Sequence, residues 1–113
     1  MAENISKDTE EKIGQLQLLE QSMQNLSVQK QNFQAQLLEI DSAIKELNET
    51  DKAYKIIGNI MVASNKEDLE ADLKSKKEMF EIRIKTIEKQ EKNIKDKAAA
   101  MQEEVMKQLQ AKK

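Results

Sequence analysis

The feature that most constrains this chain is an apolar seven-residue repeat in two long stretches, from Ile5 to about Asn48 and from about Lys66 to Leu109. Apolar residues spaced alternately three and four apart form one stripe along an α-helix, and two helices bury such stripes by coiling around each other. The chain has no proline, so neither stretch contains the residue that most often breaks a helix. The repeat therefore predicts two long helices paired along a narrow seam.

The seam of the first helix starts at Leu16 and has one polar position. Its residues are Leu16, Leu19, Met23, Leu26, Lys30, Phe33, Leu37, Ile40, Ile44 and Leu47. Before Leu16 the same spacing puts Lys12 and Thr9 on the seam and leaves Ile13 off it. We therefore expect the pairing to loosen in this segment, which would begin at a cap formed by Ser6 or Asp8.

The seam of the second helix ends near Leu109. Its residues are Leu69, Leu73, Lys77, Phe80, Ile84, Ile87, Glu91, Ile94, Ala98, Met101 and Val105. The pattern Ser64-Asn-Lys-Glu67 is that of a capping box and predicts the start of this helix. If the helices run antiparallel, the expected layers pair Ile44 with Leu73, Leu37 with Phe80, Phe33 with Ile84, Met23 with Ile94 and Leu16 with Met101.

Two polar seam residues, Lys30 and Glu91, are expected to contact each other. In the antiparallel register they lie one layer apart, and a polar pair in a seam fixes the register of two helices at some cost in stability. The alternative is that both long side chains reach solvent independently.

Between the helices lies a segment rich in isoleucine and valine, centred on Gly58-Asn59. A Gly-Asn loop between two such runs is typical of a β-hairpin, because both residues tolerate the positive φ that tight hairpin turns need. Pairing around this turn sets Ile57 opposite Ile60, Ile56 opposite Met61, Lys55 opposite Val62 and Tyr54 opposite Ala63. The expected fold is thus dominated by α-helix, a long antiparallel two-helix coiled coil joined by one β-hairpin.

Both faces of this hairpin would be apolar. A lone two-stranded hairpin is marginally stable in water, and its free edges are a template for pairing with other chains. A simple connecting loop would not need so many large aliphatic residues. We therefore expect the hairpins of several chains to join into an intermolecular β-barrel through an oligomerisation surface of Tyr54, Ile56, Ile57, Gly58, Asn59, Ile60, Met61 and Val62.

A second apolar surface is expected at the tips of the helices, remote from the hairpin. There the first seam slips, and the run from Ala98 to Ala100 thins the second seam opposite Leu18 and Leu19. Flexible methionine side chains suit surfaces that accept many partners. Met106 taken alone is better explained as an ordinary surface residue, and the off-seam apolar residues clustered near it bring the two explanations to equal weight. The candidate residues are Ile13, Leu16, Leu18, Leu19, Met101, Val105, Met106 and Leu109.

Chemistry based on imidazole or thiol groups is excluded, because the chain has no histidine and no cysteine. Carboxylate pairs such as Glu103 and Glu104 fall on charged helix faces, not in a pocket that would separate their pKa values. Gly58 has no glycine-rich phosphate loop around it. We therefore expect neither an enzyme nor a bound metal or cofactor.

Charge and hydropathy argue against nucleic-acid and membrane partners. The chain has 19 basic and 21 acidic residues with the signs interleaved, whereas strong nucleic-acid binding needs a basic face. It has no run of about 18 apolar residues that would span a membrane, and no charged-then-apolar leader for secretion. The absence of cysteine fits a reducing compartment, so the expected location is the cytoplasm.

Three segments carry a resemblance to a known family. They are Ser27-Val-Gln-Lys-Gln31, Tyr54-Lys-Ile-Ile-Gly-Asn-Ile60 and Lys85-Thr-Ile-Glu-Lys-Gln-Glu91. Together with the order helix, hairpin, helix, they resemble the beta subunit of prefoldin, particularly the archaeal form. The resemblance covers nearly the whole chain. It implies one prefoldin-like domain over residues 1–113, with helices at about 5–49 and 65–111 and the hairpin at 53–64.

The resemblance also implies a function. A single hairpin points to the beta class, because alpha-type subunits carry two. The family forms a heterohexamer of two alpha and four beta subunits, whose coiled-coil tips hold unfolded client proteins and pass them, without ATP, to a group II chaperonin. These clients and this chaperonin are implied by the resemblance alone.

Two other function classes fit parts of the sequence. An inert coiled-coil scaffold or spacer explains the repeat but not a hairpin with two apolar faces. A coiled-coil arm of a larger RNA-binding enzyme would have a basic and polar turn, whereas the turn here is aliphatic.

Overall fold

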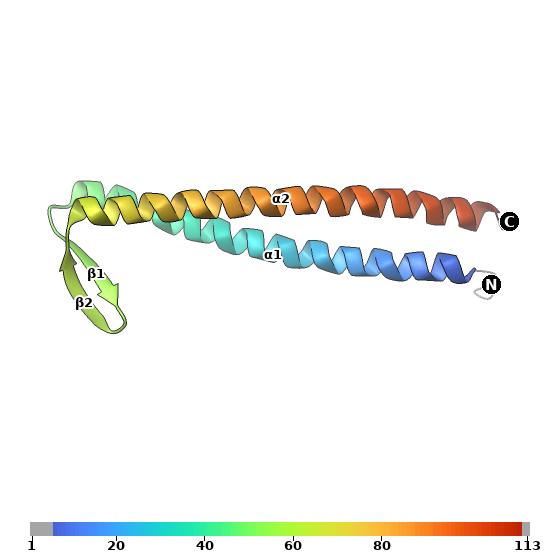
Figure 1. The fold of residues 1–113 in the computed structure, drawn as a ribbon, viewed down its shortest axis with the longest axis horizontal. Coiled ribbons are helices and arrows are strands. Elements are labelled where there is room, and N and C mark those ends of the chain that lie inside the picture. Colours follow the sequence, from blue (N-terminus) through green and yellow to red (C-terminus); the bar gives the residue numbers. More distant parts are fainter. Residues whose placement is uncertain (1–5, 112–113) are drawn as a thin grey trace. The chain divides into compact units, whose positions relative to one another are not determined.

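Two long helices and one β-hairpin make up the described part of the chain (Figure 1). The computed structural model describes residues 6–111. In sequence order the elements are α1 (Lys7–Glu49), β1 (Ala53–Ile57), β2 (Ile60–Ser64) and α2 (Lys66–Ala111). The predicted helical fold with one antiparallel hairpin is confirmed, and Ile5, where the repeat was expected to begin, lies outside the described residues.

Polar caps define where both helices begin. Ser6 caps α1, since its hydroxyl oxygen accepts a hydrogen bond of 3.1 Å from the backbone N–H of Thr9. The predicted capping box at Ser64 is wrong. Ser64 is still paired with Ala53 in the hairpin, so α2 begins one residue later than predicted. The cap is Asn65, whose side-chain oxygen accepts a hydrogen bond of 2.8 Å from the backbone N–H of Glu67.

The predicted seams are confirmed by the burial pattern. Every seam residue from Leu16 to Leu47 and from Leu69 to Val105 is buried or half-buried. The most buried apolar side chains all belong to this set, and they are Ile40, Leu47, Ile84, Ile87 and Val105. A paired two-helix structure has no room for a thicker core, so these positions supply most of the apolar burial.

The chain divides into two compact units. The hairpin unit comprises residues 30–85 and contains β1, β2 and the helical segments that flank them. The terminal unit comprises residues 1–29 and 86–113, of which 6–29 and 86–111 are described. In each unit a segment of α1 is packed on a segment of α2.

Aromatic contacts close the helix pair of the hairpin unit. The rings of Phe33 and Phe80 lie with centroids 5.6 Å apart at an angle of 37°, a tilted arrangement that aromatic pairs favour. The guanidinium of Arg83 lies 5.7 Å from the Phe33 ring centroid, within the range of a cation–π interaction. An ion pair of 2.8 Å between Lys77 and Asp41 also joins the two helices.

The terminal unit is paired as far as the start of α1, so the expected loosening at Thr9 and Lys12 is wrong. Thr9 is the most buried polar residue, with only 1% of its surface exposed. Its hydroxyl donates a hydrogen bond to the side-chain oxygen of Gln108 on α2. The seam continues in the same phase through these residues, with polar contacts in place of apolar ones.

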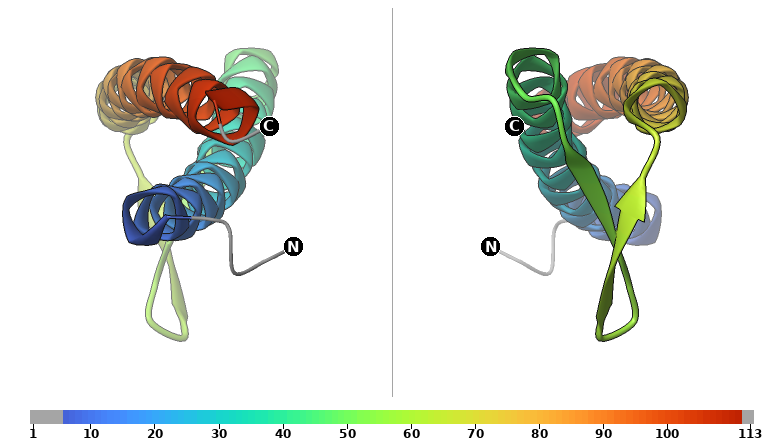
Figure 2. Two further views of the ribbon diagram at one scale, coloured as in Figure 1. Left: turned by 90° about the vertical axis from the view of Figure 1, so that its right-hand side faces the viewer. Right: turned by 90° about the vertical axis from the view of Figure 1, so that its left-hand side faces the viewer.

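The hairpin has the predicted register. Ile57 pairs with Ile60, Ile56 with Met61, Lys55 with Val62 and Tyr54 with Ala63, and Figure 2 shows the two strands twisting about each other. Of the two turn residues only Gly58 has a positive φ, at 58°. This is the φ pattern of a type II′ turn, in which glycine occupies the first central position, so Asn59 does not need the left-handed conformation.

Candidate functional surfaces

The hairpin exposes apolar side chains on both of its faces. Tyr54, Ile56 and Met61 share one face with Ala63, whereas Ile57, Ile60 and Val62 share the other with Lys55. The six large apolar residues are between 43% and 69% exposed. Among the described residues no third strand joins these two, so each strand also has an outer edge whose backbone groups are unpaired within this part of the chain.

A hollow lies beside β1 within the hairpin unit. Its volume is about 470 Å³, and its lining is Ala43, Glu46, Leu47, Thr50, Ala53, Tyr54, Lys55, Ile56, Leu69 and Leu73. The apolar surface of the hairpin therefore continues onto the adjoining ends of α1 and α2. A surface of this kind, with apolar side chains next to a free strand edge, suits contact with another folded chain.

A second hollow lies in the terminal unit. Its volume is about 430 Å³, and its lining is Gln15, Leu18, Leu19, Lys97, Ala100, Met101 and Glu104. The small side chain of Ala100 leaves this space beside Leu18, which is 64% exposed. The expected thin packing near the alanine run therefore corresponds to an open apolar groove.

The other candidates from the sequence lie in the same unit with different exposure. Met106 and Leu109 are 55% and 38% exposed, and Ile13, Leu16, Leu19 and Met101 are half-buried. Val105 is only 7% exposed, because it packs between the helices. A surface in this unit would therefore be formed by the other seven residues.

Four further exposed apolar residues were not singled out from the sequence. They are Val28, Leu38, Met79 and Ile82, and each lies off the seam. Apolar residues scattered singly over a helix surface are common in soluble proteins. Their signal in the sequence, an apolar residue out of phase with the repeat, is the same as that of Leu18 and Met106, so phase alone does not separate the two groups.

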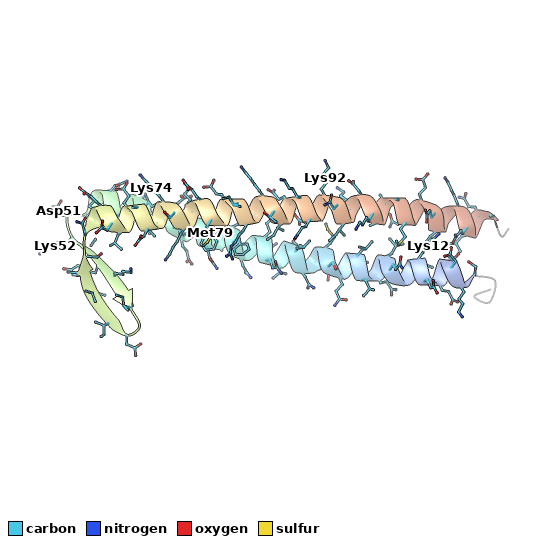
Figure 3. All side chains as sticks on the ribbon, in the orientation of Figure 1. Lys12, Asp51, Lys52, Lys74, Met79 and Lys92 are labelled. Atoms are coloured by element: carbon cyan, nitrogen blue, oxygen red, sulfur yellow. The ribbon has the colours of Figure 1, made fainter. Side chains whose placement is uncertain are left out.

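A network of polar side chains joins α1 to α2 beside the groove. Lys12, which Figure 3 shows on the side of α1 that faces α2, forms ion pairs with Glu104 at 2.8 Å and with Asp8 at 3.1 Å. The amide nitrogen of Gln108 donates a hydrogen bond of 2.9 Å to Asp8. The hydrogen bond from Gln108, with a further contribution from Lys12, lowers the pKa of Asp8, and contacts with Glu104 and Asp8 raise the pKa of Lys12.

The polar seam residues Lys30 and Glu91 are both half-buried. Their mutual contact stays a prediction.

Within residues 6–111 no cluster of acidic side chains is arranged to hold a metal ion. In the same part of the chain, no helix has the length and apolar character needed to cross a membrane.

Comparison with known proteins identifies the family. The family model described as "Prefoldin subunit" matches residues 10–112, which is almost the entire chain. The chain belongs to the prefoldin family. It is 38% identical over 96 residues to the prefoldin subunit beta of Archaeoglobus fulgidus, covering 82% of this chain and 83% of that protein. It is 32% identical over 114 residues to the prefoldin subunit beta of Methanospirillum hungatei, covering 98% and 95%.

The fold agrees with that of a prefoldin of known structure. The crystal structure of the prefoldin beta subunit from Thermococcus strain KS-1 superimposes with a TM-score of 0.85 at 29% sequence identity. The match covers 91% of this chain and 93% of that one. Membership of this family gives the chain a general role in chaperone function as a subunit of a prefoldin complex.

Proposed function

We propose that this chain is a beta-class subunit of an ATP-independent holdase, which binds unfolded proteins and transfers them to a group II chaperonin. Four copies would assemble with two alpha-class subunits in the cytoplasm. The observation that carries the proposal is the open apolar groove of the terminal unit, with Leu18 exposed beside it. An unfolded client exposes apolar side chains, and this groove offers them an apolar surface.

The chemistry of the groove suits clients of many sequences. Leu18, Leu19 and Met101 supply aliphatic and thioether groups, and a thioether adapts its shape easily to different partners. No buried donor or acceptor in the groove demands a particular polar partner, because every buried side-chain nitrogen and oxygen of the described residues is already hydrogen-bonded. Recognition would therefore depend on apolar area and not on sequence.

A single groove is too small to hold a client tightly. At about 25 cal/mol per Å² of apolar surface, a patch of a few side chains contributes only a few kcal/mol. Several grooves acting on one client chain would raise the overall affinity by a factor of about 10² to 10⁴. The proposed function therefore requires assembly, which we assign to the exposed hairpin residues from Tyr54 to Val62.

Truncation tests this proposal. Removal of residues 1–19 and 99–113 from every copy should leave a hexamer of the expected stoichiometry that no longer prevents aggregation of a chemically unfolded protein. Sizing chromatography with light scattering checks the assembly, and turbidity checks the protection. A truncated hexamer that protects as well as the intact one would contradict the assignment of the groove. If the full-length hexamer also failed to prevent aggregation, a structural spacer would be the better assignment.

A further inference from the structure

The polar network of the terminal unit connects six side chains across the helix pair. On α1 and its cap these are Ser6, Asp8, Thr9 and Lys12, and on α2 they are Glu104 and Gln108. The hydroxyls of Ser6 and Thr9 lie 2.7 Å apart, so Ser6 both caps the helix and supports the buried Thr9. We refer to these six residues as the latch.

The position of Gln108 makes the latch specific for one register. Its side-chain oxygen accepts a hydrogen bond from the Thr9 hydroxyl, and its amide nitrogen donates one to the Asp8 carboxylate. One side chain of α2 therefore forms hydrogen bonds to two consecutive residues of α1. A shift of either helix by one turn would break both bonds and leave the buried Thr9 without its partner on α2. Such a buried hydroxyl is costly when its hydrogen bonds are lost, whereas an apolar seam tolerates a shift of one heptad.

The latch is also part of the groove. Glu104, which pairs with Lys12, lines the hollow together with Leu18 and Met101. Val105 is buried next to it in the sequence, so the helix pair is closed at this level by both polar and apolar contacts. Opening the helices would therefore change the shape of the groove and expose Val105.

We propose that the terminal unit binds clients with its helices latched: the six-residue network holds one register, and the client contacts the outside of a closed helix pair. This inference rests on the proposed function, since it specifies how the same groove is used. It differs from a mechanism in which α1 and α2 separate to expose their seam. The closed mechanism needs no opening step before binding.

A chemical crosslink tests whether the unit must open. The chain has no cysteine, so Asp8→Cys with Gln108→Cys introduces the only thiols of this subunit, at two side chains that are in contact across the helix pair, with Asp8 exposed to solvent. In the complete complex, built with a cysteine-free partner subunit, a short bis-maleimide should join them after assembly. Because partners that are already in their binding conformation move little on binding, the crosslinked complex should prevent client aggregation to within about twofold of the same variant before crosslinking.

Each outcome of this experiment discriminates. Failure of the reagent to join the two cysteines, or loss of protection on crosslinking in a complex of unchanged mass, would overturn the latched mechanism. Absence of protection before crosslinking, in the variant and in the wild-type complex alike, would instead contradict the proposed function itself.

A charge reversal tests the latch without cysteines. Lys12→Glu places a third carboxylate between Asp8 and Glu104, and amide hydrogen exchange in residues 8–20 and 98–111 of the complex should rise by about tenfold. The control is Lys89→Glu, at an exposed position of α2 whose neighbours three and four residues away are Lys85, Thr86, Lys92 and Asn93. Exchange that is unchanged in Lys12→Glu, or raised equally by both variants, would show that the network does not hold the helices together.

Discussion

In the hairpin unit the helix pair is closed by aromatic and aliphatic contacts beside the ion pair of Lys77 and Asp41, whereas in the terminal unit a network of hydrogen bonds and ion pairs joins the helices beside the buried Val105. Phe33 and Phe80 are in contact in the first, and Thr9 and Gln108 are in contact in the second. Apolar contacts contribute more free energy, but they specify geometry less strictly. Polar contacts contribute less and fix one register.

The exposed apolar surfaces of the two units also differ in how strictly they specify a partner. Those of the hairpin lie next to free strand edges, where backbone hydrogen bonds give direction and spacing to a contact. Those of the terminal unit lie on helices, whose backbone groups are already paired. The first kind of surface suits one defined partner, and the second suits many. The following predictions test this contrast, beginning with the largest expected effect.

The pair Ile57→Asp and Ile60→Asp should abolish assembly. The two residues face each other across the strands, so the change would bury two unpaired carboxylates in the proposed barrel at a cost of several kcal/mol. Circular dichroism should still report helix, while sizing chromatography with the alpha-class partner should find no hexamer. As a control, Ser42→Asp with Ser75→Asp adds the same charge at exposed helix positions of the hairpin unit and should assemble normally. If the Ile57→Asp, Ile60→Asp variant still formed a hexamer, the hairpin would not be the surface that drives assembly.

Loss of the aromatic contact should destabilise the hairpin unit more than loss of a neighbouring exposed apolar side chain. Phe80→Ala removes the ring packed on Phe33 and should cost about 2–4 kcal/mol, measured by urea denaturation of the complex. The neighbouring Met79→Ala, at a 42% exposed position, should cost below about 1 kcal/mol. Equal losses from these two variants would show that the ring contact is not special.

Gly58→Val should weaken assembly through the turn. No atom lies within 4 Å of where a Cβ would be placed, so the cost arises from the φ of 58° and not from a clash. A β-branched residue resists this conformation by about 1–2 kcal/mol, which predicts roughly a tenfold weaker assembly. Asn59→Val is the matched comparison, because Asn59 has no positive φ and its position accepts a β-branched residue, and it should retain most of the assembly. Similar behaviour of both variants would contradict the role of φ.

Leu18→Glu should impair client protection without affecting assembly. It places a charge beside the apolar groove, and the concentration of complex needed to suppress aggregation should rise by roughly threefold to tenfold, because the loss is repeated in every copy. Val28→Glu is the control, since Val28 is also exposed in the terminal unit, at 56%, but does not line the groove. An equal loss in the control would mean that the groove has no special part in client binding.

The smallest expected effect is a loosening of the terminal unit in acid. Asp8 has a lowered pKa in the folded chain, so its contribution to stability is complete above the ordinary pKa of about 4 and is lost as the pH falls through the lowered value. Hydrogen exchange in residues 8–20 should therefore accelerate slightly towards pH 3. Asp8→Asn should flatten this dependence, whereas an unchanged pH profile in that variant would exclude Asp8 as its source.

The sequence was most informative where the structure depends on phase. Leu16 to Leu47 and Leu69 to Val105 keep one spacing, and the burial of these positions follows it. The register of the hairpin was also predictable, because a two-residue turn fixes which residues are opposite each other. Both features depend on local spacing alone.

The sequence was least informative where polar residues replace apolar ones. Thr9 and Lys12 kept the phase of the seam, but a polar residue in a seam predicts weak pairing unless its partner on the other helix is known. The partners Gln108 and Glu104 are almost a full chain length away in the sequence. The prediction of the α2 cap was wrong for a similar reason. Both Ser64 and Asn65 suit a cap, and the choice between them depends on where β2 ends.

The exposure of both hairpin faces has a consequence for the production of this protein in the cell. A newly made chain without partners carries isoleucine, valine and methionine side chains next to unpaired strand edges, which is the combination that promotes aggregation. Such an orphan would itself resemble a misfolded protein to the machinery of quality control. If this chain assembles as proposed, its supply must match that of its partner subunit, and any surplus should be degraded faster than the assembled form.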